Sequence, residues 1–219
     1  MKSVNIDIVS DVMCPWCYIG QKRMDKALEG LDDVDVKVSW RPFQLDPTLP
    51  PEGRDRREYL EKKFGGPERA KAIYQNIENA GLDEGIQFNF SAIGVSPNTL
   101  DAHRVIRWAG SAGDGIQEKL VTRLFEMFFL EGRNIGKHDV LIEAARDAGM
   151  DVSIVETLLP TDSDKEAVQN EIATAQQMGV TGVPCFIVDN KYAVVGAQEP
   201  EAIQNVIRQV ADAKAEAAE

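Results

Sequence analysis

Two cysteines separated by two residues, Cys14 and Cys17, are the side chains of this sequence best suited to covalent chemistry. They follow an alternating segment, residues 4–9, that predicts a strand, and Pro15 suits the first position of a helix. Cysteines three positions apart in a helix lie one turn from each other, within reach of a disulfide bond. The N–H groups and dipole of the helix N-terminus favour a thiolate, the nucleophile of disulfide exchange. We therefore expect Cys14 to form a mixed disulfide with the substrate and Cys17 to resolve it.

The cysteine count limits the other uses of this pair. The chain has three cysteines, too few for a disulfide scaffold in 219 residues. A zinc site usually takes four ligands, and only Cys185, His103 and His138 add sulfur or imidazole to the pair. We expect no metal site and no resident cofactor. A module that binds a soft metal or docks a partner through the two cysteines is kept as an alternative.

A second candidate element is Val183-Pro184, which directly precedes a predicted strand over residues 185–188. A cis bond at this point would bring the Val183 backbone to the dithiol, where it could pair with an extended substrate. An ordinary trans proline in a turn is the alternative, and base rates favour it. Trp16, between the two cysteines, is expected on the substrate-binding surface.

Three further residues are candidates for supporting roles, each with a structural alternative. Asp11 lies three residues before Cys14 and could relay a proton, or could bond nearby backbone in a turn. His103 is either a catalytic group or a structural histidine. Cys185 is either a third redox thiol near the dithiol or a buried cysteine that packs as a small hydrophobe.

The surrounding pattern predicts an α/β protein: a thioredoxin fold with a large all-helical insertion domain. Residues 34–40 alternate as a second strand, and Asp189-Asn190 predicts a tight turn before a strand over residues 192–195. Residues 1–43 and 163–219 are expected to form the thioredoxin-fold domain, and residues 44–162 the insertion. Other predicted helices cover residues 99–109, 117–130, 140–148, a segment capped by Asp151, one opened by a Ser163–Glu166 capping box, and about 200–213.

Charge and hydropathy exclude several classes of partner. The formal net charge is -12, which argues against nucleic acid and anionic membranes, because both require clustered lysine and arginine. Arg54, Arg56 and Arg57 are interpreted as a solvated turn and helix face. No apolar run approaches the roughly 20 residues that span a bilayer, and no secretion signal is recognisable. We expect a cytoplasmic protein, and the sequence leaves its oligomeric state open.

Several segments together resemble DsbA-like thioredoxin-fold oxidoreductases of the FrnE type. The resemblance covers nearly the whole chain, and its most specific parts are the segment around the two cysteines and the one before Pro184. It implies a thioredoxin fold interrupted by helices, a catalytic Cys14–Cys17 pair and a cis bond before Pro184. The segments that carry it are Ser10–Gly20, Trp40–Phe43, Pro97–Thr99 with Ala102–Arg104, Gly179–Pro184 and Val195–Gln198.

The family is also similar to 2-hydroxychromene-2-carboxylate isomerases and kappa-class glutathione transferases. Those relatives carry a serine where this chain has Cys14, and they use glutathione. The expected activity is therefore dithiol–disulfide exchange, by a protein-disulfide oxidoreductase or isomerase, on protein or small-molecule thiols and disulfides. Glutathione is a candidate co-substrate, and a glutathione-dependent isomerase or transferase is the enzymatic alternative.

Overall fold

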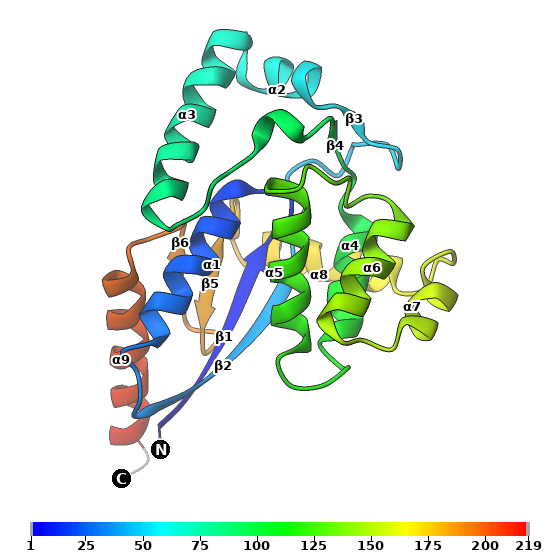
Figure 1. Ribbon diagram of the computed structural model, residues 1–219. Helices are drawn as coiled ribbons and strands as arrows, with labels where there is room; N and C mark the ends of the chain where they lie inside the picture. The colour runs from blue at the N-terminus through cyan, green and yellow to red at the C-terminus, as the bar shows by residue number, and fades with distance from the viewer. Residues whose placement is uncertain (1, 218–219) are drawn as a thin grey trace.

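The computed structural model describes residues 2–217, which fold around a four-stranded mixed sheet (Figure 1). The strands are β1 (Lys2–Ser10), β2 (Val34–Pro42), β5 (Cys185–Val188) and β6 (Tyr192–Val195), in the order β2-β1-β5-β6. β1 and β2 are parallel, whereas β5 is antiparallel to β1 and β6 antiparallel to β5. Together with the helices below, this is the predicted thioredoxin fold.

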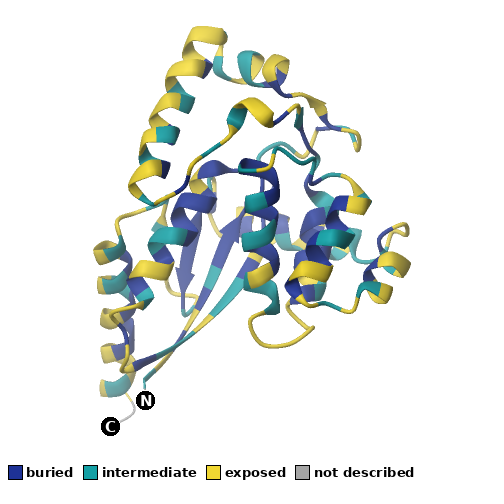
Figure 2. Cartoon of the chain, in the orientation of Figure 1, coloured by how far each residue is buried: buried dark blue, intermediate teal, exposed yellow. Residues whose placement is uncertain are grey.

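Alternate residues of the central strands pack on opposite faces of the sheet, as strand geometry requires. Ile6 and Ile8 of β1 and Phe186 of β5 belong to the main apolar cluster, together with α1 (Pro15–Leu28) and α9 (Pro200–Glu216). Val9 and Cys185 face the other way and pack with Ala175 of α8 (Lys165–Gln177) in a smaller cluster. The sheet is therefore covered by helices on both faces, and its central strands are buried (Figure 2).

The chain between β2 and α8 is mainly helical and shares the main core. Tyr18 of α1 stacks on Phe125 at a centroid distance of 5.1 Å, which joins the site helix to the helical segment. Its helices are α2 (Arg56–Phe64), α3 (Pro67–Asp83), α4 (Leu100–Ala109), α5 (Ile116–Phe129), α6 (His138–Ala148) and α7 (Val152–Leu158), with a 3₁₀ turn at Phe90–Ala92.

Helices α2 and α3 form an arm that stands above the N-terminus of α1 in Figure 1. The arm starts from a small antiparallel sheet of β3 (Arg54–Asp55) and β4 (Val95–Ser96), which the sequence pattern did not predict. At its other end, Glu84 accepts hydrogen bonds from Arg23 (2.7 Å) and Lys26 (2.6 Å) of α1. These contacts hold the arm against the helix that carries the cysteines.

Local signals in the sequence are confirmed at two places and wrong at a third. Asp189 and Asn190 take left-handed φ values of 49° and 55°, which matches the predicted hairpin turn, and Asp151 caps α7 by accepting from Ser153 N–H. The expected capping box at Ser163 is wrong, because Asp164 is the residue before α8 and no side chain caps it. No helix within residues 2–217 is long and apolar enough to cross a membrane.

Candidate active site

The two candidate catalytic cysteines open helix α1. Cys14 is the N-cap residue, and its N–H donates to the Asp11 carbonyl at 2.9 Å, in the turn that connects β1 to the helix. Cys17 N–H donates to the Cys14 carbonyl at 3.0 Å, so Cys17 lies in the first turn. Both thiols are free and almost fully buried, Cys14 with 4% and Cys17 with 1% of its surface exposed. The more accessible thiol is therefore the one at the helix terminus.

The environment of Cys17 keeps it in the thiol form. Burial raises the pKa of Cys17 well above its ordinary value, and the hydrogen bond with Cys14 and the charge of Cys14 raise it further. The hydroxyl of Ser10 and the backbone of Asp11 oppose this rise only in part. Two of the three causes that raise this pKa come from Cys14. A mixed disulfide at Cys14 would remove that charge and make Cys17 easier to ionise.

The backbone before Pro184 lies directly against the first cysteine. The Val183–Pro184 peptide bond is cis, as the resemblance implies, and the Cys14 thiol donates to the Val183 carbonyl at 3.7 Å. The Val183 N–H donates no hydrogen bond within residues 2–217. A backbone donor and acceptor beside a reactive sulfur suit an extended substrate that pairs as an added strand.

Gly20 permits this close approach, and its replacement tests it. A Cβ at Gly20 would lie 2.8 Å from Cγ of Pro184 and 3.3 Å from Cζ of Phe186. We expect Gly20→Val to lower the free energy of unfolding by about 1–3 kcal/mol through overpacking. The displaced Val183–Pro184 segment should also slow oxidation of the dithiol by glutathione disulfide. Urea denaturation measures the free energy of unfolding. Trapping and counting the free thiols at set times measures the rate of oxidation.

The matched control is Gly94→Val, since a Cβ at that exposed glycine meets nothing within 4 Å. If Gly20→Val and this control have the same free energy of unfolding and the same oxidation rate, the contact with α1 does not hold Pro184 in place.

Asp11 and His103 lie together in the interior. The Asp11 carboxylate is fully buried and accepts from Leu45 N–H at 2.7 Å and from Met13 N–H at 3.4 Å. Nε2 of His103 lies 3.5 Å from the same carboxylate and has no hydrogen-bond partner in the part of the chain that the structure describes. Asp11 thus fixes the loop before Cys14, as its turn-forming alternative predicted, and it also faces the candidate histidine.

The structure separates the two remaining candidates. Trp16 is 37% exposed beside the cysteines, where a substrate-binding residue was expected. Cys185 was expected near the dithiol if it served as a third redox thiol. Its side chain instead packs in the smaller cluster on the opposite face of the sheet, because Phe186 takes the face that carries Cys14. Burial raises the pKa of Cys185, which suits the alternative of a buried apolar cysteine.

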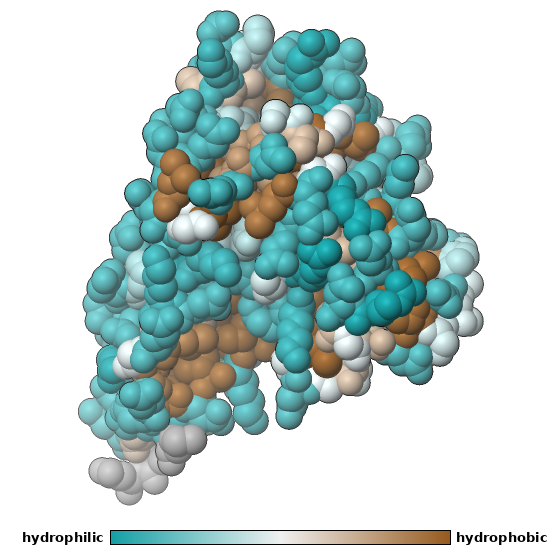
Figure 3. All heavy atoms as spheres, viewed as in Figure 1, coloured by the Kyte–Doolittle hydropathy of each residue, from teal (hydrophilic) through white to brown (hydrophobic). Residues whose placement is uncertain are grey.

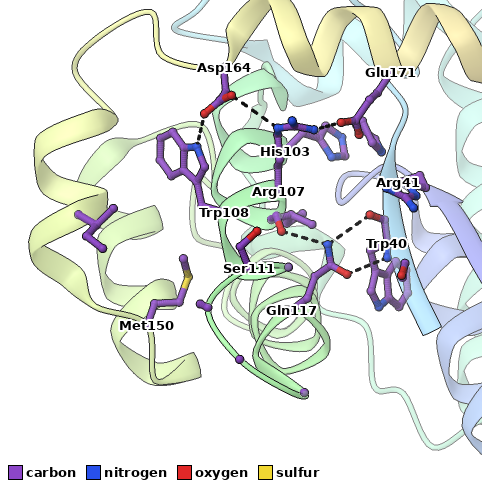
Figure 4. Close-up of a pocket in the computed structure, with 18 of the residues that line it drawn as sticks. Trp40, Arg41, His103, Arg107, Trp108, Ser111, Gln117, Met150, Asp164 and Glu171 are labelled. Carbon is purple, nitrogen blue, oxygen red and sulfur yellow. Dashed lines mark hydrogen bonds and ion pairs between the residues drawn. The ribbon is translucent and has the colours of Figure 1, made fainter. Parts of the chain in front are cut away.

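A cavity of about 820 Å³ lies beside His103, and neither Cys14 nor Cys17 lines it (Figure 4). Several polar groups along its wall pair with one another. Gln117 accepts from Trp40 N–H at 2.9 Å, and Trp108 donates to Asp164 at 2.8 Å. Because neither Cys14 nor Cys17 lines this cavity, the dithiol remains the candidate site.

Sequence reasoning missed a buried arginine at the base of the arm. Arg56, expected on a solvated face, is 5% exposed and lies over the rings of Tyr74, Phe90 and Phe128. Burial raises the pKa of Tyr74, and the charge of Arg56 acts to lower it. These side chains come from distant segments, and their spacing in the sequence gives no signal of the contact.

Comparison with known proteins shows the family of this chain. Residues 5–208 match the DSBA-like thioredoxin domain. The chain is similar to a probable DsbA oxidoreductase from Streptomyces coelicolor, with 30% identity and a TM-score of 0.84, over 94% of this chain and 89% of that one. An uncharacterized protein of Bacillus subtilis, YwbO, is 27% identical over 94% of this chain and 96% of its own.

A 2-hydroxychromene-2-carboxylate isomerase shares the fold, with a TM-score of 0.71 at 14% identity, over 97% of this chain and 98% of that one. At that identity the likeness concerns the fold alone. The match over residues 5–208 spans the sheet, the cysteines and the helical segment together. The chain belongs to the DsbA-like thioredoxin-domain family of oxidoreductases.

Proposed function

We propose that this protein exchanges dithiols and disulfides through Cys14 and Cys17. The observation that carries the proposal is the contact of the Cys14 thiol with the Val183 carbonyl, 3.7 Å away, while a free Cys17 lies one turn further along α1. One sulfur is thus placed beside a backbone edge that can hold a substrate. The other is 1% exposed and lies in the first turn of the same helix.

In the proposed reaction the Cys14 thiolate attacks one sulfur of a substrate disulfide. The substrate S–S bond breaks, one half leaves as a thiolate that takes up a proton, and the other half stays bound to Cys14. Cys17 then loses its proton and attacks the Cys14 sulfur, which releases the second half as a thiol. The protein ends with a Cys14–Cys17 disulfide and the substrate has gained two electrons. The reverse sequence oxidises a dithiol substrate.

Supporting roles follow from the contacts. Asp11 is proposed as a positioning residue, since its carboxylate holds the backbone of Met13 and Leu45 around the cysteines. Val183 and Pro184 are proposed to bind the substrate backbone, with Trp16 as an exposed apolar surface beside it. Substrates are thiols or disulfides, with glutathione as a candidate co-substrate and no resident cofactor. We place the activity in the cytoplasm, where so few cysteines suit a catalytic role.

The test is a titration of the purified protein in glutathione redox buffers, with thiols trapped at each point and counted by intact mass. We expect one two-electron transition in the wild type, retained in Cys185→Ala because that thiol lies on the other face of the sheet. The midpoint then shows whether the protein tends to donate or accept disulfides. A lasting glutathione adduct or a bound metal ion, without the internal disulfide, would replace the proposal by one of the alternatives.

A further inference from the structure

Strand β2 is one edge of the sheet, and no strand within residues 2–217 pairs with its outer side. Backbone N–H and C=O groups of alternate residues point to the same side of a strand. Trp40 points outward, because its N–H donates to the side-chain oxygen of Gln117 at 2.9 Å and its C=O accepts from the same amide at 3.3 Å. The corresponding groups of Val36 and Val38 form no hydrogen bond with a helix, a loop or a side chain of residues 2–217. The edge is therefore closed at Trp40 and open between Val36 and Val38.

Space and apolar surface lie beside this open edge. Residues Val38–Pro42 line the cavity of about 820 Å³, so the strand borders open space from Val38 onward. Val36 and Val38 pack against the main core but are only partly buried. Figure 3 shows apolar surface over the sheet between α1 and α5, where β2 runs. An open strand edge with exposed apolar side chains is a template for pairing with another chain.

Two charges on the open part of β2 have no partner in the chain. Asp35 and Lys37 alternate with the valines, so their side chains lie on the other face of the sheet. Further along that face, Arg41 pairs with Asp7 of β1 at 2.6 Å. Asp35 and Lys37 form no ion pair and no side-chain hydrogen bond within residues 2–217. They carry opposite charges on either side of Val36, so a copy of the strand turned end to end would place an acid opposite each base.

We propose that two copies of this chain form a dimer in which their β2 strands pair antiparallel, centred on Val36. In this register Asp35 lies directly opposite Lys37 of the partner subunit, and the symmetry of the dimer repeats this pair. Opposite charges at directly opposed positions stabilise an antiparallel strand pair. On the other face, Val34 lies opposite Val38 of the partner subunit, so the partly exposed valines cover one another. The contact uses the same residues on both copies and therefore closes as a dimer.

The charge pattern favours a second copy over a different protein. A lysine on an edge strand usually discourages pairing, but in this register Lys37 meets a carboxylate instead of another lysine. The formal net charge of -12 makes two copies repel each other, so their association requires local complementarity. Val36 lies beside Val4, in the N-terminal half of β1, whereas the two cysteines follow the C-terminal end of that strand. The inference therefore goes beyond the proposed disulfide exchange and does not depend on it.

The test is sedimentation equilibrium of the reduced protein over a wide range of concentration. We expect the mass of the wild type to rise with concentration, from that of the 24.2 kDa chain to twice that value. Asp35→Lys and Lys37→Asp each place like charges opposite one another at two points of the interface. Either change should raise the dissociation constant of the dimer by about tenfold or more. The double variant, which carries both changes, restores opposite charges and should dimerise again.

Lys71→Asp is the matched control, because it makes the same change in net charge at an exposed lysine of α3. It should dimerise like the wild type. A wild type that stays monomeric at every concentration would overturn the proposal. So would a dimer that neither single reversal weakens, since the two copies would then meet through another surface. A double variant that stays as weak as the single ones would show that Asp35 and Lys37 do not face each other.

Should a reversal variant fail to fold, cross-linking of the wild type decides the question. Isotope-labelled and unlabelled protein are mixed and treated with a carbodiimide, which joins a carboxylate to a neighbouring amine as an amide with loss of water. Peptide mass spectrometry should then find Asp35 of one copy linked to Lys37 of the other, in peptides that combine a labelled and an unlabelled half. Links that join only residues of the same copy, or no link at this pair, would contradict the proposed dimer.

Discussion

Replacement of Cys17 by serine should leave a stable mixed disulfide on Cys14 when the reduced protein meets a disulfide substrate. The resolving thiol is intramolecular in the wild type, and well-placed intramolecular groups act at effective molarities of about 10⁵ M or more. An external thiol at millimolar concentration is a poor substitute. We therefore expect turnover in a disulfide reductase assay to fall by on the order of 100-fold or more. Intact mass of the acid-quenched reaction identifies the adduct.

The control for this variant is Cys185→Ser, which changes a cysteine on the opposite face of the sheet. It should form no lasting adduct and keep its turnover. The raised pKa of Cys17 adds a further expectation, because a buried thiol reacts slowly with iodoacetamide near neutral pH. The first alkylation of the reduced wild type should therefore fall on Cys14. Rapid turnover by Cys17→Ser without an adduct would show that Cys17 does not resolve the intermediate.

The second large effect is expected from Arg104→Met. The Arg104 guanidinium donates to the carbonyls of Leu158, Leu159, Thr161 and Ser163, at distances between 2.6 and 3.1 Å. These carbonyls lie at the end of α7 and in the link to α8, and methionine would leave them without this donor. Removing one partner from a buried charged network costs about 3–5 kcal/mol. We expect a loss of that size in the free energy of unfolding, measured by urea denaturation followed by circular dichroism.

Arg107→Met is the matched control on the same helix. Its side chain is 40% exposed and pairs with Glu171 at the surface, where an ion pair contributes about 0–1 kcal/mol. Arg104→Lys should fall between the two, because one ammonium group cannot reach all four carbonyls. If Arg104→Met unfolds at the same urea concentration as Arg107→Met, the hydrogen bonds from Arg104 to the four carbonyls contribute nothing to stability.

The sequence by itself determined the features that depend on near neighbours along the chain. The spacing of Cys14 and Cys17 after an alternating segment predicted a dithiol at a helix N-terminus, and the structure places both residues there. Alternation predicted β2, and Asp189-Asn190 predicted the hairpin turn. These features can be predicted from the sequence because helix and strand periodicity, caps and turns depend on residues only a few positions apart.

The tertiary structure decided which distant groups meet. Cys185 begins a strand, Cys185–Val188, that is buried on both faces, so its all-apolar sequence did not show which face the thiol takes. The isomer at Val183–Pro184 could not be read from spacing, because trans is the common state for an X–Pro bond. Arg56 looks like its exposed neighbour Arg54 in sequence. Only the folding of the arm encloses it with Tyr74, Phe90 and Phe128, because that contact depends on long-range packing and leaves no periodic pattern.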